Sequence, residues 1–390
     1  MIGDRAEIAN RVRTGVTSRR ALLAGTVVGA TGLTGLVAAS PASAASQPGA
    51  ASPSPSASPS ASASASPAAS ASAATSASGA PGSGWIDVTQ DPYDADPTGQ
   101  SDSTAAIQAA LTAVPATGAV VYLPVGTYQI SGALTVSSYT TIQGDGDGAT
   151  IIKQTSTTSH GLLAVDAQHI NVADVWLYGP SSGSGNGIHL GLNANPNFPY
   201  TSVRRVTLSH WGSHGVYVNT PIVSEFERVV SALNGGDGFH PSAPVACTSL
   251  RFSSCYANSN AGTGYFLVNA QYSVLEGCAA DSNGNGYHLA GCHSVTINGC
   301  GAEGTTTDSF IFQGGSGNSV VGCWVYNNNA TGIVVGAAES NLALIGCTEN
   351  GPLAAASWFI SATAGSSGAL LNATNVSQNN LPAAGWTTLA

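Results

Sequence analysis

The segment NGGDGFHPSAP, residues 234–244, places Asp237 and His240 three residues apart among glycines. A carboxylate and an imidazole at this spacing can share a proton, and such pairs act as general acids and bases. Tyr217 precedes His240 by 23 residues and offers a phenol as a third proton-transferring group. Asp237, His240 and Tyr217 are therefore the predicted catalytic residues, provided that the fold brings them together.

A repeat of about 23 residues decides how these positions are arranged. Each unit holds short alternating apolar segments broken by glycine and asparagine, without helical periodicity. A leucine-rich repeat has a similar period but needs a leucine framework that this chain lacks. The pattern predicts an all-β parallel β-helix over residues 84–390, with one unit per coil. The units begin at Gly215, Gly238, Gly264, Gly286, Ser309 and Gly332.

Cysteines and asparagines recur with the same period. Cysteines in an exported protein suggest disulfides, but the total of seven is odd, and five of them fall once per coil. Zinc is the alternative, but no C-x-x-C pair accompanies them. We expect a buried ladder of thiols, formed by Cys255, Cys278, Cys300, Cys323 and Cys347. A second column, which we expect to hydrogen-bond along the stack, comprises Asn234, Asn260, Asn283 and Asn328.

The first 83 residues are typical of an export signal followed by a tether. Arg19 and Arg20 precede a mildly apolar run and a small-residue cleavage pattern at residues 42–44, which predicts a twin-arginine signal peptide over residues 1–44. A membrane anchor is the alternative. Residues 45–83 are a Ser/Ala/Pro-rich linker with nothing large to bury. We therefore expect a secreted or cell-surface protein that is exported by the twin-arginine route.

The charge of the predicted domain limits its partners. From residue 84 onward, five basic residues stand against eighteen acidic ones, a formal net charge near −13. Nucleic acid is therefore excluded as a partner, because a basic surface is missing. A polyanionic glycan would be repelled unless a cation such as calcium bridged it. The sequence is compatible with a homo-oligomer.

Three motifs near the start of the domain carry a family resemblance. They are DPTGQSDSTAAIQAA, GAVVYLPVGTY and IQGDG, within residues 96–146. They resemble the pectin lyase-like proteins of the pectate-lyase-3 type, which include phage tailspike-like and polygalacturonase-related β-helices. The resemblance implies a right-handed, single-stranded β-helix, capped at its N-terminal end by a short helix at about residues 104–112. It implies no particular activity, because lyases, hydrolases, epimerases and non-enzymatic fibres share this fold.

Strand parity assigns one column of side chains to an outward face. Alternate residues of a strand face opposite sides, so the apolar neighbours point inward and these point out. The outward column is His189, Tyr217, His240, Phe266, His288, Ile311 and Val334. A column just before these strands is Asn186, His214, Asp237, Thr263, Asn285 and Asp308. From these two columns we expect His189, His214, Phe266 and His288 to bind substrate beside the catalytic residues.

A competing patch follows the cysteine column. Asp281 and Glu303 are predicted to lie on adjacent coils, about 5 Å apart, which suits a retaining glycosidase pair. Trp324 could supply a sugar-stacking platform beside them. The alternative is a solvated acidic edge or a weak cation site. Elsewhere, Arg204 is expected to pair with Glu227 and Arg251 with Glu225, which leaves few free cations to neutralise an acidic sugar.

Three functions remain open. The first is a polysaccharide-degrading glycoside hydrolase in which Asp237 is the acid or base and His240 and Tyr217 assist it. The second is a polyuronate lyase or epimerase, in which His240 and Tyr217 move the proton and calcium bridges the substrate. The third is a non-catalytic glycan-binding or cell-surface module. The sequence predicts no metal site and no cofactor apart from that calcium.

Overall fold

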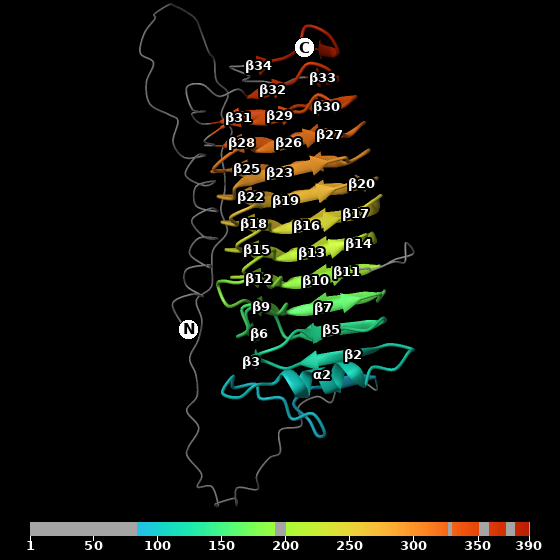
Figure 1. The fold of residues 1–390 in the computed structure, drawn as a ribbon, viewed down its shortest axis with the longest axis vertical. Coiled ribbons are helices and arrows are strands. Elements are labelled where there is room, and N and C mark those ends of the chain that lie inside the picture. Colours follow the sequence, from blue (N-terminus) through green and yellow to red (C-terminus); the bar gives the residue numbers. More distant parts are fainter. Residues whose placement is uncertain (1–83, 192–199, 327–329, 351–358, 372–378, 390) are drawn as a thin grey trace, which may run out of the picture. The chain divides into compact units, whose positions relative to one another are not determined.

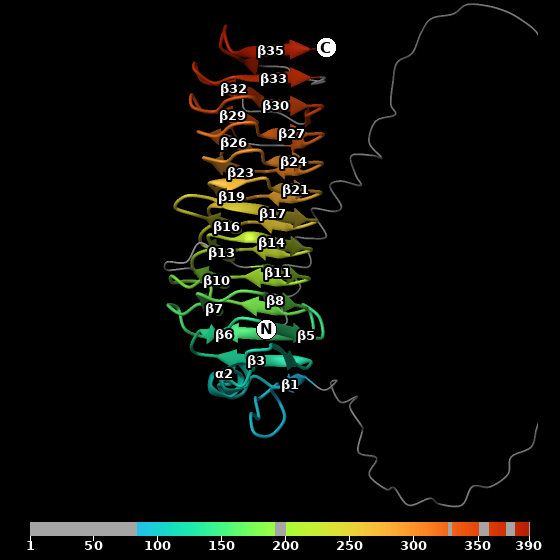
Figure 2. The same cartoon turned by 90° about the vertical axis from the view of Figure 1, so that its right-hand side faces the viewer.

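The computed structural model describes residues 84–191, 200–326, 330–350, 359–371 and 379–389. Within Pro81–Ala390, which form one compact unit, the described chain winds into coils that stack along one axis (Figure 1). Each coil adds a strand to parallel sheets that run the length of the stack (Figure 2). The predicted parallel β-helix is confirmed. The predicted signal peptide, the linker and Asn328 lie outside the described residues.

Sheet C carries the predicted outward column. Its paired residues recur at roughly the predicted period, since Tyr217 pairs with His240 and Tyr265 with Tyr287. Its strands are β4 (Leu134–Thr135), β7 (Leu162–Val165), β10 (Ile188–Gly191), β13 (Val216–Asn219), β16 (Phe239–Ser242), β19 (Thr263–Val268), β23 (Asn285–Ala290), β26 (Phe310–Gln313), β29 (Ile333–Val335), β32 (Ile360–Ala362) and β34 (Asn379–Asn380).

Sheet A follows sheet C along each coil. Its strands are β1 (Trp85–Asp87), β2 (Ala119–Leu123), β5 (Thr140–Gly144), β8 (Ile170–Ala173), β11 (Thr201–Arg204), β14 (Ile222–Glu227), β17 (Cys247–Ser253), β20 (Ala270–Gln271), β21 (Val274–Glu276), β24 (Thr296–Asn298), β27 (Ser319–Val321), β30 (Leu342–Ile345), β33 (Gly368–Leu371) and β35 (Trp386–Leu389).

Sheet B completes each coil and carries the competing acidic patch. Its strands are β3 (Gly126–Ile130), β6 (Thr150–Gln154), β9 (Trp176–Tyr178), β12 (Thr207–Ser209), β15 (Val230–Ala232), β18 (Tyr256–Asn258), β22 (Ala279–Asp281), β25 (Gly301–Glu303), β28 (Trp324–Tyr326) and β31 (Thr348–Asn350).

Helix α2 (Thr104–Thr112) lies across the N-terminal end of the stack, as predicted (Figure 1). It buries Ile107, Ala110 and Leu111 against the first coils. The carboxylate of Asp102 accepts the backbone N–H of Thr104 at 2.8 Å and so satisfies a free donor at the start of the helix. No helix in the described ranges is long and apolar enough to cross a membrane.

The interior is filled by ladders of like side chains, because each coil repeats the pattern of the one before. Phe239, Tyr265, Tyr287 and Phe310 stack face to face with ring centroids 4.8 to 4.9 Å apart. Asn234 donates through its side chain to Asn260 at 2.8 Å, and Asn260 donates to Asn283 at 2.8 Å. The asparagine ladder is therefore confirmed for the three members that the structure describes.

The cysteine ladder is also confirmed. All seven cysteines are buried and free of disulfides. The backbone N–H of Cys278 lies 3.4 Å from Cys300 Sγ, and that of Cys300 lies 3.4 Å from Cys323 Sγ. A sharp turn precedes four of these thiols, at residues with a left-handed φ of 57° to 59° that glycine adopts without strain. These turn residues are Gly277, Gly299, Gly322 and Gly346.

Native thiol chemistry should follow from this burial. Burial raises the pKa of Cys255 well above its usual value and also raises that of Cys347, so little reactive thiolate forms at neutral pH. We expect at least four of the five ladder cysteines to resist alkylation in the native protein and to react after denaturation, counted by mass spectrometry. Cys278→Ser should lower the free energy of unfolding by about 1–3 kcal/mol, because its buried hydroxyl is poorly satisfied. Ready labelling of the native protein would contradict the inward assignment.

Candidate active site

The structure brings the predicted outward residues of sheet C into one column, although Ile311, which was also expected to be exposed, is buried. His189 pairs with Tyr217, Tyr217 with His240, and Phe266 with His288. The rings touch in sequence along the coils: His189–Tyr217 at 4.9 Å between centroids, Tyr217–His240 at 5.4 Å, His240–Phe266 at 4.8 Å and Phe266–His288 at 4.5 Å. The predicted residues of sheet C therefore form one continuous surface.

The column just before these strands is joined by side-chain-to-backbone hydrogen bonds. A side chain in one coil accepts the N–H of the equivalent residue in the next coil. Asn186 Oδ1 accepts His214 N–H at 3.0 Å, His214 Nδ1 accepts Asp237 N–H at 2.9 Å, and Asp237 Oδ1 accepts Thr263 N–H at 2.6 Å. The same pattern recurs from Asn285 to Asp308 and from Asp308 to Thr331. These bonds fix the orientation of His214 and Asp237 at the edge of sheet C.

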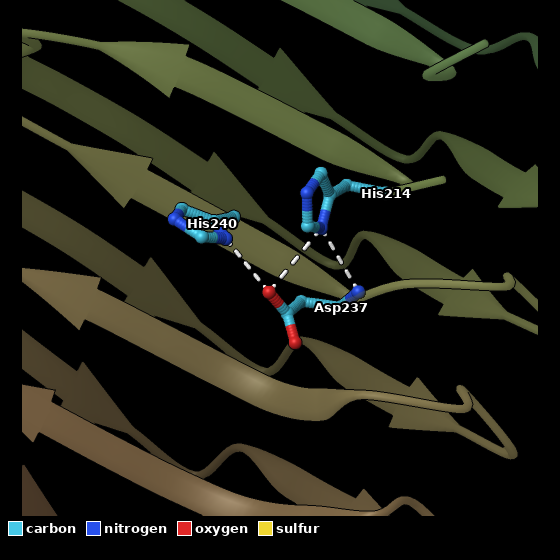
Figure 3. A group of neighbouring side chains, drawn as sticks. All are labelled: His214, Asp237 and His240. Atoms are coloured by element: carbon cyan, nitrogen blue, oxygen red, sulfur yellow. Dashed lines mark hydrogen bonds and ion pairs between the residues drawn. The ribbon is translucent and has the colours of Figure 1, made fainter. Parts of the chain in front are cut away.

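Asp237 and His240 form the most closely coupled pair of the site (Figure 3). His240 Nδ1 lies 2.7 Å from Asp237 Oδ2. Burial would raise the pKa of Asp237, but the hydrogen bonds that its carboxylate accepts from His240 and from the backbone N–H of Thr263 outweigh it and hold that pKa well below its usual range. An ionised Asp237 must accept this hydrogen bond, so the proton lies on Nδ1 and neutral His240 keeps the lone pair of Nε2.

This geometry changes the role predicted for Asp237. The sequence suggested that its carboxyl is itself the acid or base. Both carboxylate oxygens are instead occupied by hydrogen bonds, and the lowered pKa removes the proton that an acid would need. Asp237 therefore orients and polarises His240, whose side chain keeps 16% of its surface exposed. His240 is the group able to exchange protons with a ligand.

A metal ion could use the same cluster. His214 Nδ1, Asp237 Oδ2 and His240 Nδ1 all lie within 4.8 Å of one another. Imidazole and carboxylate together suit a transition metal better than calcium, which prefers oxygen ligands. In this structure the atoms bond one another instead: His214 Nδ1 accepts Asp237 N–H and lies 3.2 Å from Asp237 Oδ2, and His240 Nδ1 donates to the same carboxylate oxygen. A metal ion would have to replace these bonds.

The competing patch lies on sheet B, on a different strand of each coil. Asp281 pairs with Glu303 in adjacent strands, as predicted. Tyr256 donates its hydroxyl to Asp281 Oδ2 at 2.7 Å. Trp324 stacks on Tyr326 at 5.0 Å between ring centroids. Trp324 therefore belongs to this second patch and does not join the binding residues predicted on sheet C.

One participant, His160, was missed in the sequence. His160 occupies the pre-strand position one coil before Asn186, and its Nδ1 accepts Asn186 N–H at 3.0 Å. Its ring lies 4.3 Å from that of His189. The signal was present, because His160-Gly161 matches His214-Gly215 in type and place. Asn186 was placed in the column, but its contact with His189 was not foreseen.

The arginines lie on sheet A, away from this surface. Arg251 Nη1 lies 3.6 Å from Glu225 Oε1, as predicted, and Arg251 also contacts Glu276. Arg204 pairs with Glu227 in adjacent strands, as predicted, but its guanidinium lies 3.8 Å from Glu225. Glu225 thus lies between two arginines. None of the described sheet C strands contains lysine or arginine, so histidines are the only basic side chains on this sheet.

The half-buried histidines of sheet C and its edge should make the fold sensitive to acid. Burial lowers the pKa of His160 and His288 below the ordinary 6.5, and lowers that of His189 to about 4. Between about pH 6.5 and pH 4, these histidines bind protons in the unfolded chain but not in the folded chain. Acid therefore favours unfolding: the folded protein has its full stability above about pH 6.5 and loses part of it as the pH falls toward 4. We expect the melting temperature to fall across that window, and less steeply in His189→Gln. Equal slopes in the two proteins would contradict the burial argument for His189.

Two family models match the chain. The model of "Rhamnogalacturonase A/epimerase, pectate lyase-like" proteins matches residues 85–217, and that of the "Right handed beta helix region" matches residues 186–348. These matches confirm the resemblance to pectin lyase-like proteins and the right-handed β-helix. In sequence, no curated protein matches this chain.

Solved structures share the fold at low identity. The AlgE6 A-module of the mannuronan C-5 epimerase of Azotobacter vinelandii is 18% identical, with a TM-score of 0.60 over 78% of this chain and 98% of that one. DFA-IIIase of Arthrobacter chlorophenolicus A6, without its lid, is 11% identical, with a TM-score of 0.56 over 79% and 90%. Geobacillus virus E2 ORF18 is 16% identical, with a TM-score of 0.56, and this chain, matched over 74% of its length, covers 61% of that protein. At these identities the likeness shows the fold alone.

Proposed function

We propose that this protein is a polysaccharide-active enzyme that moves a proton at a sugar carbon next to a carboxylate, as a polyuronate lyase or epimerase does. The observation that carries the proposal is the 2.7 Å bond between Asp237 and His240 beside the phenol of Tyr217. His240 Nε2 removes the carbon-bound proton, and the positive charge that forms on the imidazole is stabilised by Asp237. Tyr217, on the neighbouring strand, supplies the acid.

The two reactions differ only in where the second proton goes. In elimination, the C5–H bond breaks, a double bond forms between C4 and C5, and Tyr217 protonates the departing O4. In epimerisation, a proton returns to C5 on the opposite face of the ring. His240 and Tyr217 lie side by side on one face of sheet C, with ring centroids 5.4 Å apart. This arrangement suits elimination, in which base and acid can act from the same side, better than epimerisation. Neither reaction needs a second carboxylate.

Hydrolysis at the same place is less well supported. A glycosidase needs two carboxyl groups about 5 to 9.5 Å apart, one of them protonated. Asp237 is held ionised, and the next carboxylate in its column is Asp308, three coils and roughly 14 Å away by strand spacing. Glycoside hydrolysis therefore remains the second candidate function, at Asp281 and Glu303, because their pairing in adjacent strands gives a suitable separation.

The comparisons include this class of reaction but do not distinguish it from hydrolysis. One matched family model names rhamnogalacturonase and epimerase, and one structural neighbour is a mannuronan C-5 epimerase module. A uronate carboxylate must be neutralised before its neighbouring proton becomes acidic. Since the described sheet C strands lack lysine and arginine, imidazole N–H groups or calcium brought with the substrate would have to do so. If a chelator of divalent cations abolishes the activity and added calcium restores it, calcium is the group that neutralises the carboxylate.

A substrate panel tests the proposed function. The mature protein is incubated with polyuronates and with neutral glucans and fructans, and three products are followed. Absorbance from a new C4–C5 double bond identifies a lyase, and altered sugar configuration by proton NMR identifies an epimerase. Reducing ends without unsaturation would overturn the proposal in favour of hydrolysis. Binding of a glycan without any product would favour the third function, a non-catalytic glycan-binding module.

We also propose that the protein reaches its substrate outside the cell through the twin-arginine route. Replacing both Arg19 and Arg20 with lysine should leave the precursor in the cytoplasm, because that pathway requires the arginine pair. Immunoblots of cytoplasmic, membrane and culture fractions measure the outcome. Normal secretion of the double variant would refute this route.

A further inference from the structure

We propose that Asn186 and His189 form a second hydrogen-bonded pair of the same site, in which His189 donates from Nε2 to an oxygen of the saccharide chain. His189 would then recognise a sugar unit beyond the one at which the proton moves. The proposal rests on the proposed function for its ligand class, an oligouronate. The hydrogen-bonded pair and the tautomer of His189 do not depend on the proposed function.

The two pairs occupy equivalent positions in different coils. Asn186-Gly-Ile-His189 and Asp237-Gly-Phe-His240 share the spacing and the place at the start of a sheet C strand. Asn186 Nδ2 lies 2.8 Å from His189 Nδ1, and Asp237 Oδ2 lies 2.7 Å from His240 Nδ1. Tyr217 lies on the strand between them. The only change in the anchoring group is an amide in place of a carboxylate.

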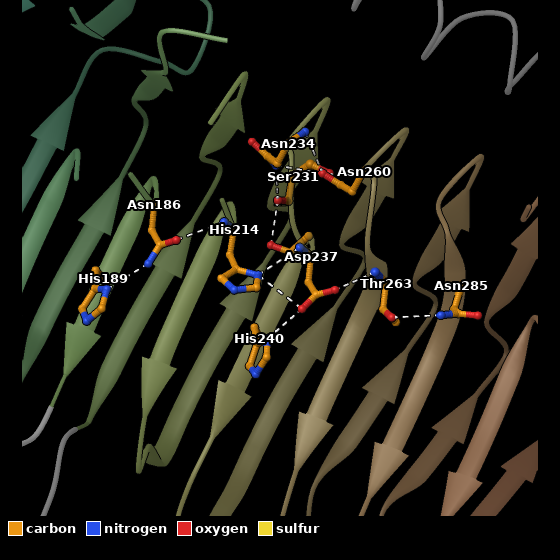
Figure 4. A network of polar contacts seen from close by, with 11 residues as sticks. Asn186, His189, His214, Ser231, Asn234, Asp237, His240, Asn260, Thr263 and Asn285 are labelled. Atoms are coloured by element: carbon orange, nitrogen blue, oxygen red, sulfur yellow. Dashed lines mark hydrogen bonds and ion pairs between the residues drawn. The ribbon is translucent and has the colours of Figure 1, made fainter. Parts of the chain in front are cut away.

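The amide orientation determines which His189 nitrogen carries the proton. The backbone N–H of His214 donates to Asn186 Oδ1 at 3.0 Å, so the NH2 group of Asn186 must face His189 (Figure 4). An NH2 group only donates, so His189 Nδ1 must accept. Neutral His189 therefore carries its proton on Nε2. His240, anchored by a carboxylate, carries its proton on Nδ1, so the two histidines have opposite tautomers.

The surroundings keep His189 neutral. Burial, aided by repulsion from His160 and His214, lowers the pKa of His189 to about 4. The ring lies between those of His160, at 4.3 Å, and Tyr217, at 4.9 Å. Asn186 offers it no negative charge. At neutral pH His189 is therefore a fixed N–H donor and a poor base, which suits the binding of a hydroxyl or carboxylate oxygen.

The separation along the axis determines what His189 can touch. It lies two strands from His240, roughly 10 Å away by the spacing of a parallel sheet. That distance is too long for contact with the reacting carbon. It is within the span of adjoining units of a polysaccharide that follows the ring column. His189 is accordingly a binding residue, and Asn186 is a positioning residue that acts through it.

Asn186→Asp tests the proposal directly, because it gives His189 the anchor that His240 has. Nitrogen-15 NMR of the imidazoles should show wild-type His189 protonated on Nε2 and the variant protonated on Nδ1, with a higher pKa. Km for an oligouronate should rise about tenfold, as expected for one lost hydrogen bond, with kcat changed much less. His189→Ala should raise Km similarly. Asn171→Asp, the same charge change on β8 of sheet A, is the matched control and should alter neither quantity.

The outcomes separate this inference from the proposed function. A proton on Nδ1 of wild-type His189 would overturn the inference whatever the activity. If Asn186→Asp changes the tautomer of His189 but leaves Km unaltered, His189 does not contact the substrate, and that part of the inference is wrong. If no polyuronate is turned over, the proposed function fails, and titration of oligogalacturonate against the His189 resonances then decides. Ligand-dependent shifts of those resonances in the wild-type protein would support the inference, and unperturbed resonances would overturn it.

Discussion

His240→Ala is expected to lower turnover at least about 100-fold, the usual effect of removing an acid–base group. The side chain lies on the outward face of a rigid strand, between the rings of Tyr217 and Phe266. Its removal should leave the buried ladders and the melting temperature nearly unchanged. Initial rates on the active polyuronate, with thermal melting curves, measure both quantities.

Asp237→Asn should cause a loss of similar size for a different reason. Thr263 N–H would keep the amide oxygen on its own side, which leaves the NH2 group facing His240 Nδ1. The proton of His240 would then move to Nε2, so the base would become a donor, as in the Asn186–His189 pair. Because asparagine retains the shape of aspartate, a tautomer change without unfolding is the expected NMR signature.

Asp281→Asn serves as the control on the competing patch. It removes a charge from sheet B and leaves every contact on sheet C in place. We expect less than a tenfold loss of turnover. The reverse ranking, with Asp281→Asn severe and His240→Ala mild, would move the chemistry to Asp281 and Glu303 and favour hydrolysis.

The sequence predicted the coils and their faces because both depend on periodicity. Once the 23-residue period is set, strand parity alone places Tyr217 beside His240 and Asp281 beside Glu303, and the register confirms both pairs. Such positions follow from the backbone, which the repeat specifies one coil at a time.

The chemistry of individual groups could not be obtained in the same way. The role of Asp237 depends on an N–H of Thr263 one coil further on, and the tautomer of His189 depends on an N–H of His214. These contacts depend on how each side chain is rotated within its column. The repeat period fixes the column but carries no information about that rotation.

The second large effect is expected inside the stack, at Asn260. This side chain is buried and makes hydrogen bonds in both directions along the axis. Its Oδ1 accepts the backbone N–H of Asn234 at 3.2 Å and the Asn234 side chain at 2.8 Å. Its Nδ2 donates to Ser231 O at 2.9 Å and to Asn283 Oδ1 at 2.8 Å. Replacement by alanine removes all four of these bonds where water has little access.

Asn260→Ala should therefore lower the free energy of unfolding by roughly 3 kcal/mol, because a buried donor left without a partner costs about 1–3 kcal/mol and the neighbouring groups lose part of their bonding. Guanidinium denaturation of the purified protein measures the change. Asn298→Ala, at an exposed position on β24, is the matched control and should change the same quantity by less than about 0.5 kcal/mol. Similar small losses in both variants would mean that the asparagine column only fills space. A large loss at Asn260 alone would show that its hydrogen bonds hold successive coils in register, and with them the column that places His214 and Asp237 beside His240.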